Sequence, residues 1–322
     1  MISCELTFGD TLGAWKSRWG IGRMSYLVPP GLYALGNPGP GDHVLVTANY
    51  KMSYDIVRRE LRGRNIWLLV LETYGINVWC AAGKGTFGTG EIVRRVEATG
   101  LANVVDHRLL ILPILGAPGV SAHGVKARTG FSVRYATIRA SDLPEFLDNG
   151  MKTTPRMREL TFNAYERLVL TPIELKAAVR KSIPLFALLF LAGAFTSGSF
   201  SPADGVYPVF AYSGGLLAGA VVTPVLLPWL PTRSFSVKGA VMGLLWALFF
   251  YVVIGSDWNG FQVLANFFLL PIETSFLALN FTGSTPFTSP SGVRKEMRLS
   301  LPVMAAALIA GIVFLVMGKM IE

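Results

Sequence analysis

One cysteine lies where a strand-like apolar run gives way to a helical pattern, and a thiolate in that position could bind a soft metal. The 322 residues contain two cysteines, Cys4 and Cys80. Cys80 lies in the stretch Asn-Val-Trp-Cys-Ala-Ala-Gly-Lys (77–84), between an apolar run at 65–71 and a helical pattern at 88–99. We therefore predict a glycine-rich loop at or near a helix start, where unpaired backbone N–H groups favour the thiolate form of a cysteine. The thiolate is the form that binds metal.

Three other interpretations of this stretch remain open on the residues alone. A single cysteine in apolar surroundings is most often a small core residue. The phosphate-binding loop pattern requires a glycine where this chain has Val78, and a serine or threonine where it has Gly85, so a nucleotide site is disfavoured. A Cys–His hydrolase would need one of His43, His107 or His123, whose places in the fold the sequence does not fix.

The stretch 77–84 resembles the signature of the HgcA family of mercury-methylating corrinoid proteins. Further segments resemble the corrinoid-binding domain that this family shares with the large subunit of the corrinoid iron–sulfur protein: 44–51, 73–77, 85–89 and 115–119. The resemblance covers about residues 25 to 150. It implies that Cys80 is the catalytic residue and the lower axial ligand of a corrinoid (cobalamin-type) cobalt.

Cofactor-binding residues are expected beyond the carboxyl ends of the strands, where open α/β sheets bind their ligands. Three loops are predicted to leave strands at that edge, and their small residues would let the backbone approach a flat macrocycle. On spacing alone, the simpler interpretation is favoured, that the glycines and prolines only shape turns; the resemblance reverses this. The predicted residues are Thr47, Asn49, Tyr50, Thr73, Gly75, Asn77, Val78, Trp79, Ala81, Ala82, Gly83, Lys84, Gly85, Thr86, Phe87, Leu115, Gly116, Ala117, Gly119 and Val120.

A histidine ligand for the cobalt is not supported. The Asp-x-His-x-x-Gly motif of other cobalamin proteins is absent from the sequence, because Asp42-His43 and Asp106-His107 are adjacent pairs and His123 has no aspartate before it. This favours Cys80 as the ligand.

The resemblance implies a corrinoid-dependent methyltransferase. It would transfer a methyl group, as a carbanion equivalent, from Cys-ligated methylcobalt(III) corrinoid to Hg(II), giving methylmercury. Two cysteines exclude a tetracysteine iron–sulfur cluster within these residues. The implied partners are therefore the ferredoxin-like protein HgcB, with two [4Fe–4S] clusters, as electron donor, and a methyltetrahydrofolate-linked methyl donor. Two alternatives stay open: a membrane-bound corrinoid methyl carrier of one-carbon (acetyl-CoA-type) metabolism, and a non-catalytic transporter with a regulatory head.

Charge and hydropathy divide the chain into a basic head and an apolar tail. Residues 1–182 hold 23 Lys and Arg against 15 Asp and Glu, whereas residues 183–322 hold 6 against 5. The basic head suits an anionic inner leaflet or an acidic protein partner, and no nucleic-acid-binding motif is present. We predict an N-terminal strap (1–43), a Rossmann-like α/β corrinoid-binding domain (44–150), a basic connector (151–182) and an all-α transmembrane domain of about five helices (183–322).

Alternating strand and helix patterns in the head indicate a mostly parallel sheet. The predicted strands cover 44–48, 66–71, 103–105, 109–112 and 131–136. The predicted helices cover 53–61, with Ser53 as N-cap, 88–99, 121–127, 142–147 and 157–167. Residues 1–40 are expected to be irregular.

Five apolar spans in the tail are each close to the ~20 residues that cross a bilayer. They are 183–200, 206–227, 237–255, 261–281 and 299–320. Lys and Arg lie before the first span and in alternate loops, which predicts a multi-pass protein of the inner membrane with its head in the cytoplasm and its C-terminus outside. Glu273 lies inside the fourth span; the sequence leaves open whether it lines a polar path or is a hydrogen-bonded structural acid.

Overall fold

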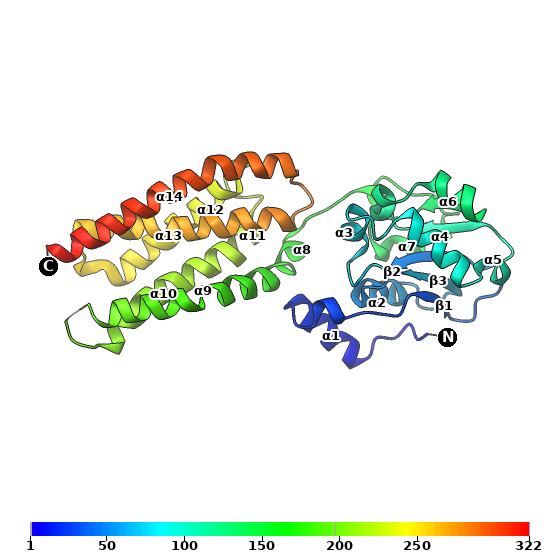
Figure 1. Ribbon diagram of the computed structural model, residues 1–322, viewed down its shortest axis with the longest axis horizontal. Coiled ribbons are helices and arrows are strands. Elements are labelled where there is room, and N and C mark those ends of the chain that lie inside the picture. The colour runs from blue at the N-terminus through cyan, green and yellow to red at the C-terminus, as the bar shows by residue number, and fades with distance from the viewer. Residues whose placement is uncertain (1, 197, 322) are drawn as a thin grey trace. The chain divides into compact units, whose positions relative to one another are not determined.

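The chain folds as two compact units that divide between residues 161 and 162 (Figure 1). The structure is a computed structural model, in which residues 2–196 and 198–321 are described. The first unit, called the sheet unit, contains a five-stranded sheet with helices on both faces. The second, called the helical unit, consists of helices. These two architectures confirm the predicted α/β head followed by an all-α tail.

The sheet has the order β1-β3-β2-β4-β5, in which β1 is antiparallel to β3 and the other pairs are parallel. The strands are β1 (Gly31–Leu35), β2 (Val44–Ala48), β3 (Ile66–Leu71), β4 (Leu109–Leu112) and β5 (Ser132–Tyr135). The mostly parallel sheet predicted from the sequence is thus confirmed, with one antiparallel strand at its edge.

Both faces of the sheet are covered, which explains why its central strands are almost continuously apolar. Val44, Val46 and Ala48 of β2 face one core with side chains from α3, α4, α5 and α6. Leu45 faces a second core with side chains from α2 and α7. The helices of this unit are α1 (Phe8–Arg18), α2 (Lys51–Glu60), α3 (Val78–Gly83), α4 (Thr89–Ala98), α5 (Leu101–Val104), α6 (Ala122–Thr129) and α7 (Leu143–Asp148), with 3-10 turns at Arg23–Ser25, Ile114–Gly119, Ala140–Asp142 and Arg156–Arg158.

The first 40 residues are more regular than predicted. Thr7 accepts a hydrogen bond from the backbone N–H of Asp10, and the Asp10 side chain accepts one from the backbone N–H of Thr7. This capping box starts α1 where the sequence analysis expected irregular chain. Strand β1 was also missed, because its residues become a strand by pairing with β3 along Gly31–Leu35.

Three further predictions in the head are wrong at the level of single elements. Residues 103–105 do not form a strand: Gly100 adopts a left-handed φ of 58°, and α5 begins directly after it. The helix predicted at 157–167 is two short pieces, because Asn163 is extended and caps α8 (Ala164–Leu168). Helix α2 begins two residues before Ser53, with Tyr50 as its N-cap residue.

The helical unit has five helical spans that are long and apolar enough to cross a membrane, among the residues that the structure describes. They are Ala164–Ala194, Pro202–Leu226, Phe235–Asp257, Gly260–Ser284 and Pro290–Met320. The helices within them are α8, α9 (Thr171–Ala194), α10 (Pro202–Leu217), a π-helical turn (Ala218–Val222), α11 (Thr223–Leu226), α12 (Phe235–Ile254), α13 (Gly260–Asn280) and α14 (Pro290–Met320). The predicted number of spans is confirmed, but the first helix begins within the predicted connector and the last begins before residue 299.

Small residues let α12 and α13 pack closely. A Cβ atom at Gly239 would lie 2.5 Å from the carbonyl oxygen of Thr274, and one at Gly243 would overlap the Thr274 side chain. Glycines at such crossings are typical of membrane helices, whose association depends on close van der Waals packing.

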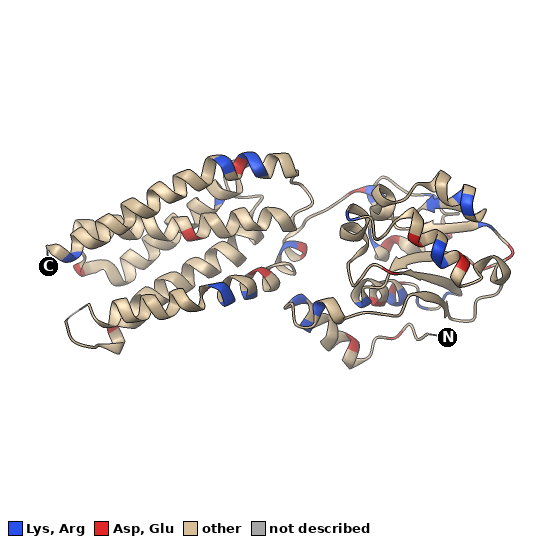
Figure 2. Cartoon of the chain, viewed as in Figure 1, with Lys and Arg blue, Asp and Glu red and all other residues tan. Residues whose placement is uncertain are grey.

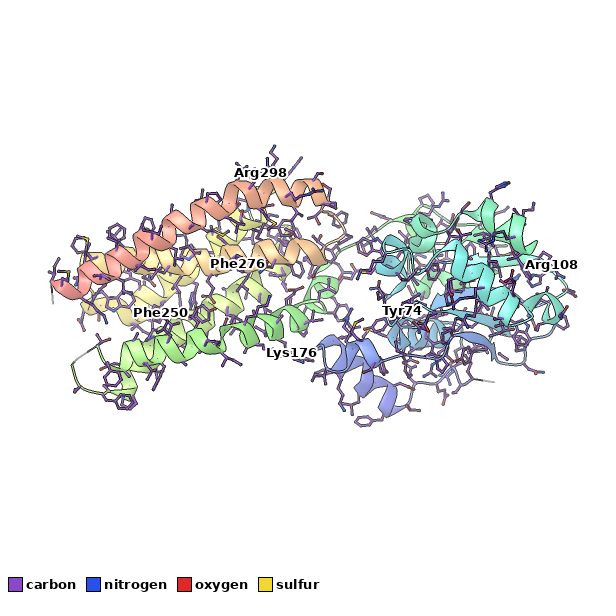
Figure 3. The ribbon with its side chains drawn as sticks, in the orientation of Figure 1. Tyr74, Arg108, Lys176, Phe250, Phe276 and Arg298 are labelled. Atoms are coloured by element: carbon purple, nitrogen blue, oxygen red, sulfur yellow. The ribbon has the colours of Figure 1, made fainter. Side chains whose placement is uncertain are left out.

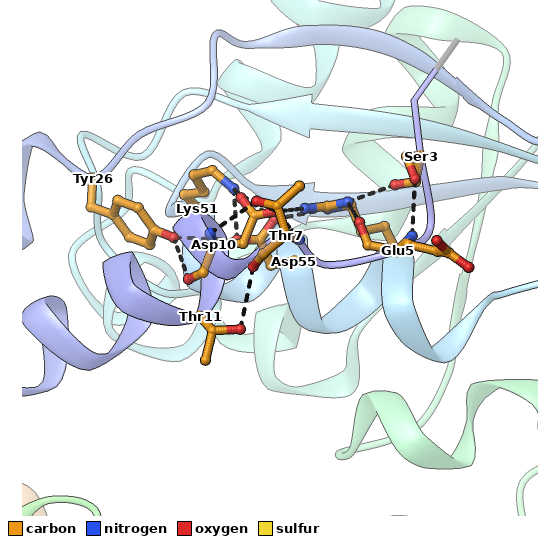
Figure 4. A network of polar contacts seen from close by, with 9 residues as sticks. Ser3, Glu5, Thr7, Asp10, Thr11, Tyr26, Lys51 and Asp55 are labelled. Carbon is orange, nitrogen blue, oxygen red and sulfur yellow. Dashed lines mark hydrogen bonds and ion pairs between the residues drawn. The ribbon is translucent and has the colours of Figure 1, made fainter.

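A network of charged side chains holds α1 against α2 (Figure 4). Asp10 of α1 pairs with Lys51 and with Arg58, and Asp55 pairs with the same two cations. Burial alone would raise the pKa of Asp10, but hydrogen bonds from Lys51, Thr7 and Arg58 hold it well below its usual value of 3.8. The network therefore fixes the strap as long as Asp10 is ionised.

Asp10→Asn should lower the free energy of unfolding by about 1–3 kcal/mol at pH 7, because two cations lose a charged acceptor. A carboxylate whose pKa is lowered in the folded state contributes stability above its unfolded pKa and loses it as the pH falls. The stability of the parent should thus fall below about pH 3.8, and that of Asp10→Asn should fall less steeply there. Denaturation of the full chain in detergent, followed by tryptophan fluorescence, measures both effects.

Asp148→Asn is the matched control, since Asp148 is 66% exposed in its ion pair with Arg64. An exposed pair contributes less than about 1 kcal/mol. Equal losses in the two variants would show that the Asp10 network does not hold the strap.

Candidate functional site

Cys80 is the third residue of α3, and it is exposed. Asn77 caps this helix, because its Oδ1 accepts a hydrogen bond of 2.9 Å from the backbone N–H of Cys80. The predicted position near a helix start is confirmed, but Cys80 lies in the first turn of the short helix and not in a loop, and of the nearby glycines Gly83 ends α3 and Gly85 follows it. The apolar-core interpretation of Cys80 is also wrong, since the residue lies on the surface.

The loop between β3 and α3 is held by the side chain of Asn49 at the end of β2. Its Oδ1 accepts hydrogen bonds from the backbone N–H groups of Thr73 (3.1 Å) and Gly75 (3.2 Å), and it lies 2.8 Å from Thr73 Oγ1. Its Nδ2 donates to Glu72 Oε1 at 2.7 Å. Asn49 and Thr73 are 1% and 0% exposed, so both are committed to positioning the loop that leads to Cys80.

A second carboxylate ties the end of β3 to α4. Glu91 Oε1 accepts the backbone N–H of Glu72 at 2.8 Å, and the Glu91 carboxylate pairs with Arg94 and Arg95. Burial alone would raise the pKa of Glu91, but these hydrogen bonds outweigh it and lower the pKa below its usual value of 4.5. Glu91 is therefore ionised at neutral pH and fixes the end of β3, from which the loop to Cys80 leads.

A pocket of about 310 Å³ lies beside α3. It is mostly apolar, and five of the predicted site residues line it: Thr47, Asn77, Val78, Trp79 and Leu115. These come from the end of β2, the start of α3 and the turn after β4, as expected for the carboxyl edge of a parallel sheet. Trp79 lines the pocket and is still 42% exposed, so the pocket reaches the surface at this residue.

Other predicted residues are engaged within the protein. The hydroxyl of Tyr50 lies 2.7 Å from Ser17 Oγ of the strap. Ala81, Ala82 and Phe87 belong to the core, and Val120 is buried with them. Thr86 Oγ1 donates to the carbonyl oxygen of Ala81 at 3.4 Å.

The predicted glycines divide into two groups. Gly116 packs on the ring of Phe87, and a Cβ atom at Gly119 would lie 3.0 Å from the Cα atom of Ala82, so both allow the turn after β4 to pack on α3 and the loop that follows it. Gly75 has a left-handed φ of 72°, a backbone conformation that favours glycine. By contrast, Gly83 and Gly85 have no atom within 4 Å of an added Cβ, and with Lys84 they form an exposed surface next to Cys80. Ala117 is half-buried.

A second set of lining residues was not predicted. They come from α2, from the chain after β5 and from the first residue of α7: Ser53, Ile56, Val57, Ala136, Thr137, Ile138, Ala140 and Leu143. Residues 136–138 follow β5 at the carboxyl edge of the sheet, so the rule that located the other three loops would have located this one too.

The histidines do not form a metal site with Cys80. His43 directly precedes β2 and His107 lies two residues before β4, so both are at the amino end of the sheet. His107 Nε2 lies 2.8 Å from the carbonyl oxygen of Asp42. Burial lowers the pKa of His43. Among the described residues, no group of three or more His, Cys, Asp or Glu side chains could hold a metal ion. Cys80 could thus supply one ligand to a metal that arrives with others.

The sheet unit is similar to subunits of one enzyme complex. Residues 22–147 match the family model for the CO dehydrogenase/acetyl-CoA synthase delta subunit. The gamma subunit of the acetyl-CoA decarbonylase/synthase complex from Methanopyrus kandleri is 40% identical over 124 residues, which cover 38% of this chain and 26% of that protein. The gamma subunits from Methanocaldococcus jannaschii and Archaeoglobus fulgidus are 33% and 36% identical over 39% of this chain, or 26% and 27% of their own length.

This chain therefore spans about a quarter of the length of these relatives, and the family match lies within the sheet unit. The predicted resemblance over about residues 25 to 150 is confirmed at this coarser level. The three relatives named above are gamma subunits of acetyl-CoA decarbonylase/synthase complexes.

Asn49→Ala should destabilise the chain by about 1–3 kcal/mol, because the N–H groups of Thr73 and Gly75 would lose their buried acceptor. The freed loop should also change the rate at which maleimide alkylates Cys80. Thermal unfolding and mass spectrometry of the alkylated protein measure the two effects. Asn103→Ala, an exposed change on α5, should alter neither, and equal behaviour of the two variants would contradict the role given to Asn49.

Proposed function

We propose that the sheet unit binds a corrinoid and takes part in methyl transfer, with Cys80 as the lower axial ligand of the cobalt. The observation that carries this proposal is that Cys80 is exposed and directly follows three residues, Asn77, Val78 and Trp79, that line a mostly apolar pocket at the carboxyl edge of the sheet. The similarity of residues 22–147 to acetyl-CoA synthase subunits supports it.

The residues present fit such a cofactor. A macrocycle already provides four ligands to its metal, so the protein needs to add only one, and the described residues offer one cysteine and no larger group at this edge. The open surface at Gly83 and Gly85 lets a flat group come close to the backbone. The pocket is too small for a whole corrinoid, so it would take one part of the cofactor.

The protein's own residues would hold and orient the sulfur. Asn77 caps α3 and fixes the backbone of Cys80, Asn49 fixes the loop before α3, and Val78 and Trp79 exclude water from one side. A bound corrinoid supplies a cobalt that carries the methyl group between donor and acceptor. A thiolate from Cys80 would donate electron density to that cobalt, which would favour loss of the methyl group with its bonding electrons, as the Hg(II) reaction requires.

Two acceptors for the methyl group are supported by different observations. The relatives are acetyl-CoA decarbonylase/synthase subunits, which favours a methyl carrier of one-carbon metabolism. The signature at 77–84 favours Hg(II), a soft electrophile that would accept a carbanion equivalent and give methylmercury. In both cases the methyl donor would be linked to methyltetrahydrofolate.

The mercury reaction would take a bonding electron pair from the corrinoid at each turnover, so it would need an electron donor, for which a protein with iron–sulfur clusters is suited. Cys4 and Cys80 are the two cysteines of the sequence, so these residues cannot hold a tetracysteine cluster. For the mercury reaction the donor would be the ferredoxin-like HgcB. A net positive sheet unit would attract an acidic partner of this kind.

The cofactor proposal is tested with the purified full chain, reconstituted with cobalamin and compared with Cys80→Ala. The parent should bind cobalamin with an absorbance spectrum characteristic of sulfur–cobalt ligation. Cys80→Ala should lose that spectrum, and its cobalamin affinity should fall at least tenfold, while thermal unfolding changes little because Cys80 is exposed. Cys4→Ala should match the parent. A parent that stays colourless, or an unchanged spectrum in Cys80→Ala, would overturn the proposal.

The same proteins separate the two acceptors. With a methyl donor and a reducing iron–sulfur protein present, methylmercury formation from Hg(II) that depends on Cys80 supports the mercury reaction. Methyl transfer to an acetyl-CoA-synthase-type acceptor, without methylmercury, supports the one-carbon carrier.

We also propose that the sheet unit faces the cytoplasm and that the chain ends outside the inner membrane. Figure 2 shows Lys and Arg near the beginnings of α9 and α14, and few charges between the helix ends. On the side expected inside, Arg233 lies between α11 and α12, and Arg294, Lys295 and Arg298 lie near the start of α14. On the side expected outside, Asp204 lies at the start of α10, Asp257 lies in the 3-10 turn after α12, and Lys319 lies near the end of α14.

Fusions to alkaline phosphatase test this orientation, because the enzyme becomes active only outside the cytoplasm. A fusion after Met320 should be active, and a fusion after Ser289, between the fourth and fifth spans, should be inactive. The reverse pattern would show that the orientation is wrong.

A further inference from the structure

The helical unit contains a groove of about 1200 Å³ that does not involve Cys80. Its lining comes mainly from two helix pairs, α9 with α10 and α13 with α14. On α9 the lining residues recur along one face from Glu174 to Ala192, which is about 27 Å of helix and close to the thickness of the hydrocarbon core. The groove is therefore long enough to run through the depth of a bilayer.

The lining is apolar over most of its length. It includes Leu185, Leu188, Leu269, Phe276, Leu308 and Ile312. Phe250 and Phe276, from α12 and α13, lie at different levels along the helices and both line the groove (Figure 3). A groove of this volume could hold an organic molecule of drug size or larger.

One ionisable group in this groove has no partner. Both carboxyl oxygens of Glu273 are buried, and neither has a hydrogen-bond partner among the described residues. The hydrogen-bonded structural acid that the sequence left open is therefore not what the structure shows. Gly215 of α10 leaves the space for this carboxyl group, because a Cβ atom at Gly215 would overlap Glu273 Oε2.

Three polar side chains of the groove, those of Ser182, Asn266 and Glu174, do have partners. Ser182 Oγ lies 2.6 Å from Tyr212 Oη, and Asn266 Nδ2 donates to the carbonyl oxygen of Ala247 at 2.9 Å. Glu174, at one end of the groove, accepts a hydrogen bond of 2.6 Å from Ser284 Oγ. Glu273 differs from these groups because neither of its carboxyl oxygens has a hydrogen-bond partner among the described residues.

We propose that the groove binds a lipophilic cation, an apolar organic molecule with one positive charge that pairs with Glu273. A buried carboxylate without a partner is costly, and a ligand that supplies a positive charge in apolar surroundings removes that cost. The apolar lining accounts for the body of the ligand, and the carboxylate accounts for its charge. This site goes beyond the methyl-transfer proposal and does not depend on it.

The test uses the full chain in nanodiscs of phosphatidylcholine, with radiolabelled tetraphenylphosphonium as probe. Tetraphenylborate has nearly the same size and shape but the opposite charge. The parent should bind tetraphenylphosphonium saturably, and Glu273→Gln should bind it at least tenfold more weakly. Tetraphenylborate should not distinguish the two proteins. Partition of either probe into the lipid is the same for both proteins and cancels in the comparison.

Two further variants keep the result interpretable. Asp257→Asn removes an exposed carboxylate of the helical unit that does not line the groove, and it should bind tetraphenylphosphonium like the parent. Leu188→Trp fills the groove at a residue that is 63% exposed, so it should abolish saturable binding without disturbing the fold even if Glu273→Gln proves unstable.

Equal binding of tetraphenylphosphonium to the parent, to Glu273→Gln and to Leu188→Trp would overturn the proposal. So would equal saturable binding of both probes to the parent, since it would mean that Glu273 is a neutral acid in a groove for uncharged molecules or lipid chains.

Discussion

The candidate site depends on one buried carboxamide. Asn49 accepts the backbone N–H groups of Thr73 and Gly75 and donates to Glu72, and through these contacts the end of β2 dictates the course of the chain after β3. Without this side chain, two N–H groups would be buried with no acceptor, which costs more than the hydrogen bonds themselves contribute. The position of α3, and with it the place of Cys80 on the surface, follows from this local constraint.

A similar division between positioning and exposed residues explains the rest of the edge. Gly116 and Gly119 let the turn after β4 pack against Phe87 and Ala82, and this contact helps to hold α3 in place. The residues left free, from Gly83 to Gly85, lie on the outer side together with the sulfur of Cys80. The fold thus commits one group of small residues to packing and leaves another group open to a ligand.

The sequence was sufficient where a pattern has a local physical cause. The strands at 44–48, 66–71 and 109–112 could be predicted because strands covered on both faces are apolar throughout, and the five spans because a bilayer requires long apolar helices. Elements that depend on distant partners could not be predicted. Helix α1 is held by Lys51 and Arg58, and β1 becomes a strand by pairing with β3.

The same limit applies to the site. The spacing around Cys80 indicated a helix start. It did not show that the loop before the helix depends on Asn49 and Glu91, because Asn49 is 24 positions from its partner Thr73 and Glu91 is 19 positions from its partner Glu72. The pocket wall after β5 was missed for a different reason, because its residues carry no distinctive chemistry and only the direction of the strand locates them.

The exposure of Cys80 has a consequence for handling the protein in air. A surface thiol is open to peroxide and to other thiols, and its oxidation proceeds from sulfenic acid to forms that reductants do not reverse. Oxidation at Cys80 would leave the fold intact, because the residue is exposed and takes no part in the core. We therefore expect preparations made under oxygen to stay folded while they lose the free thiol of Cys80.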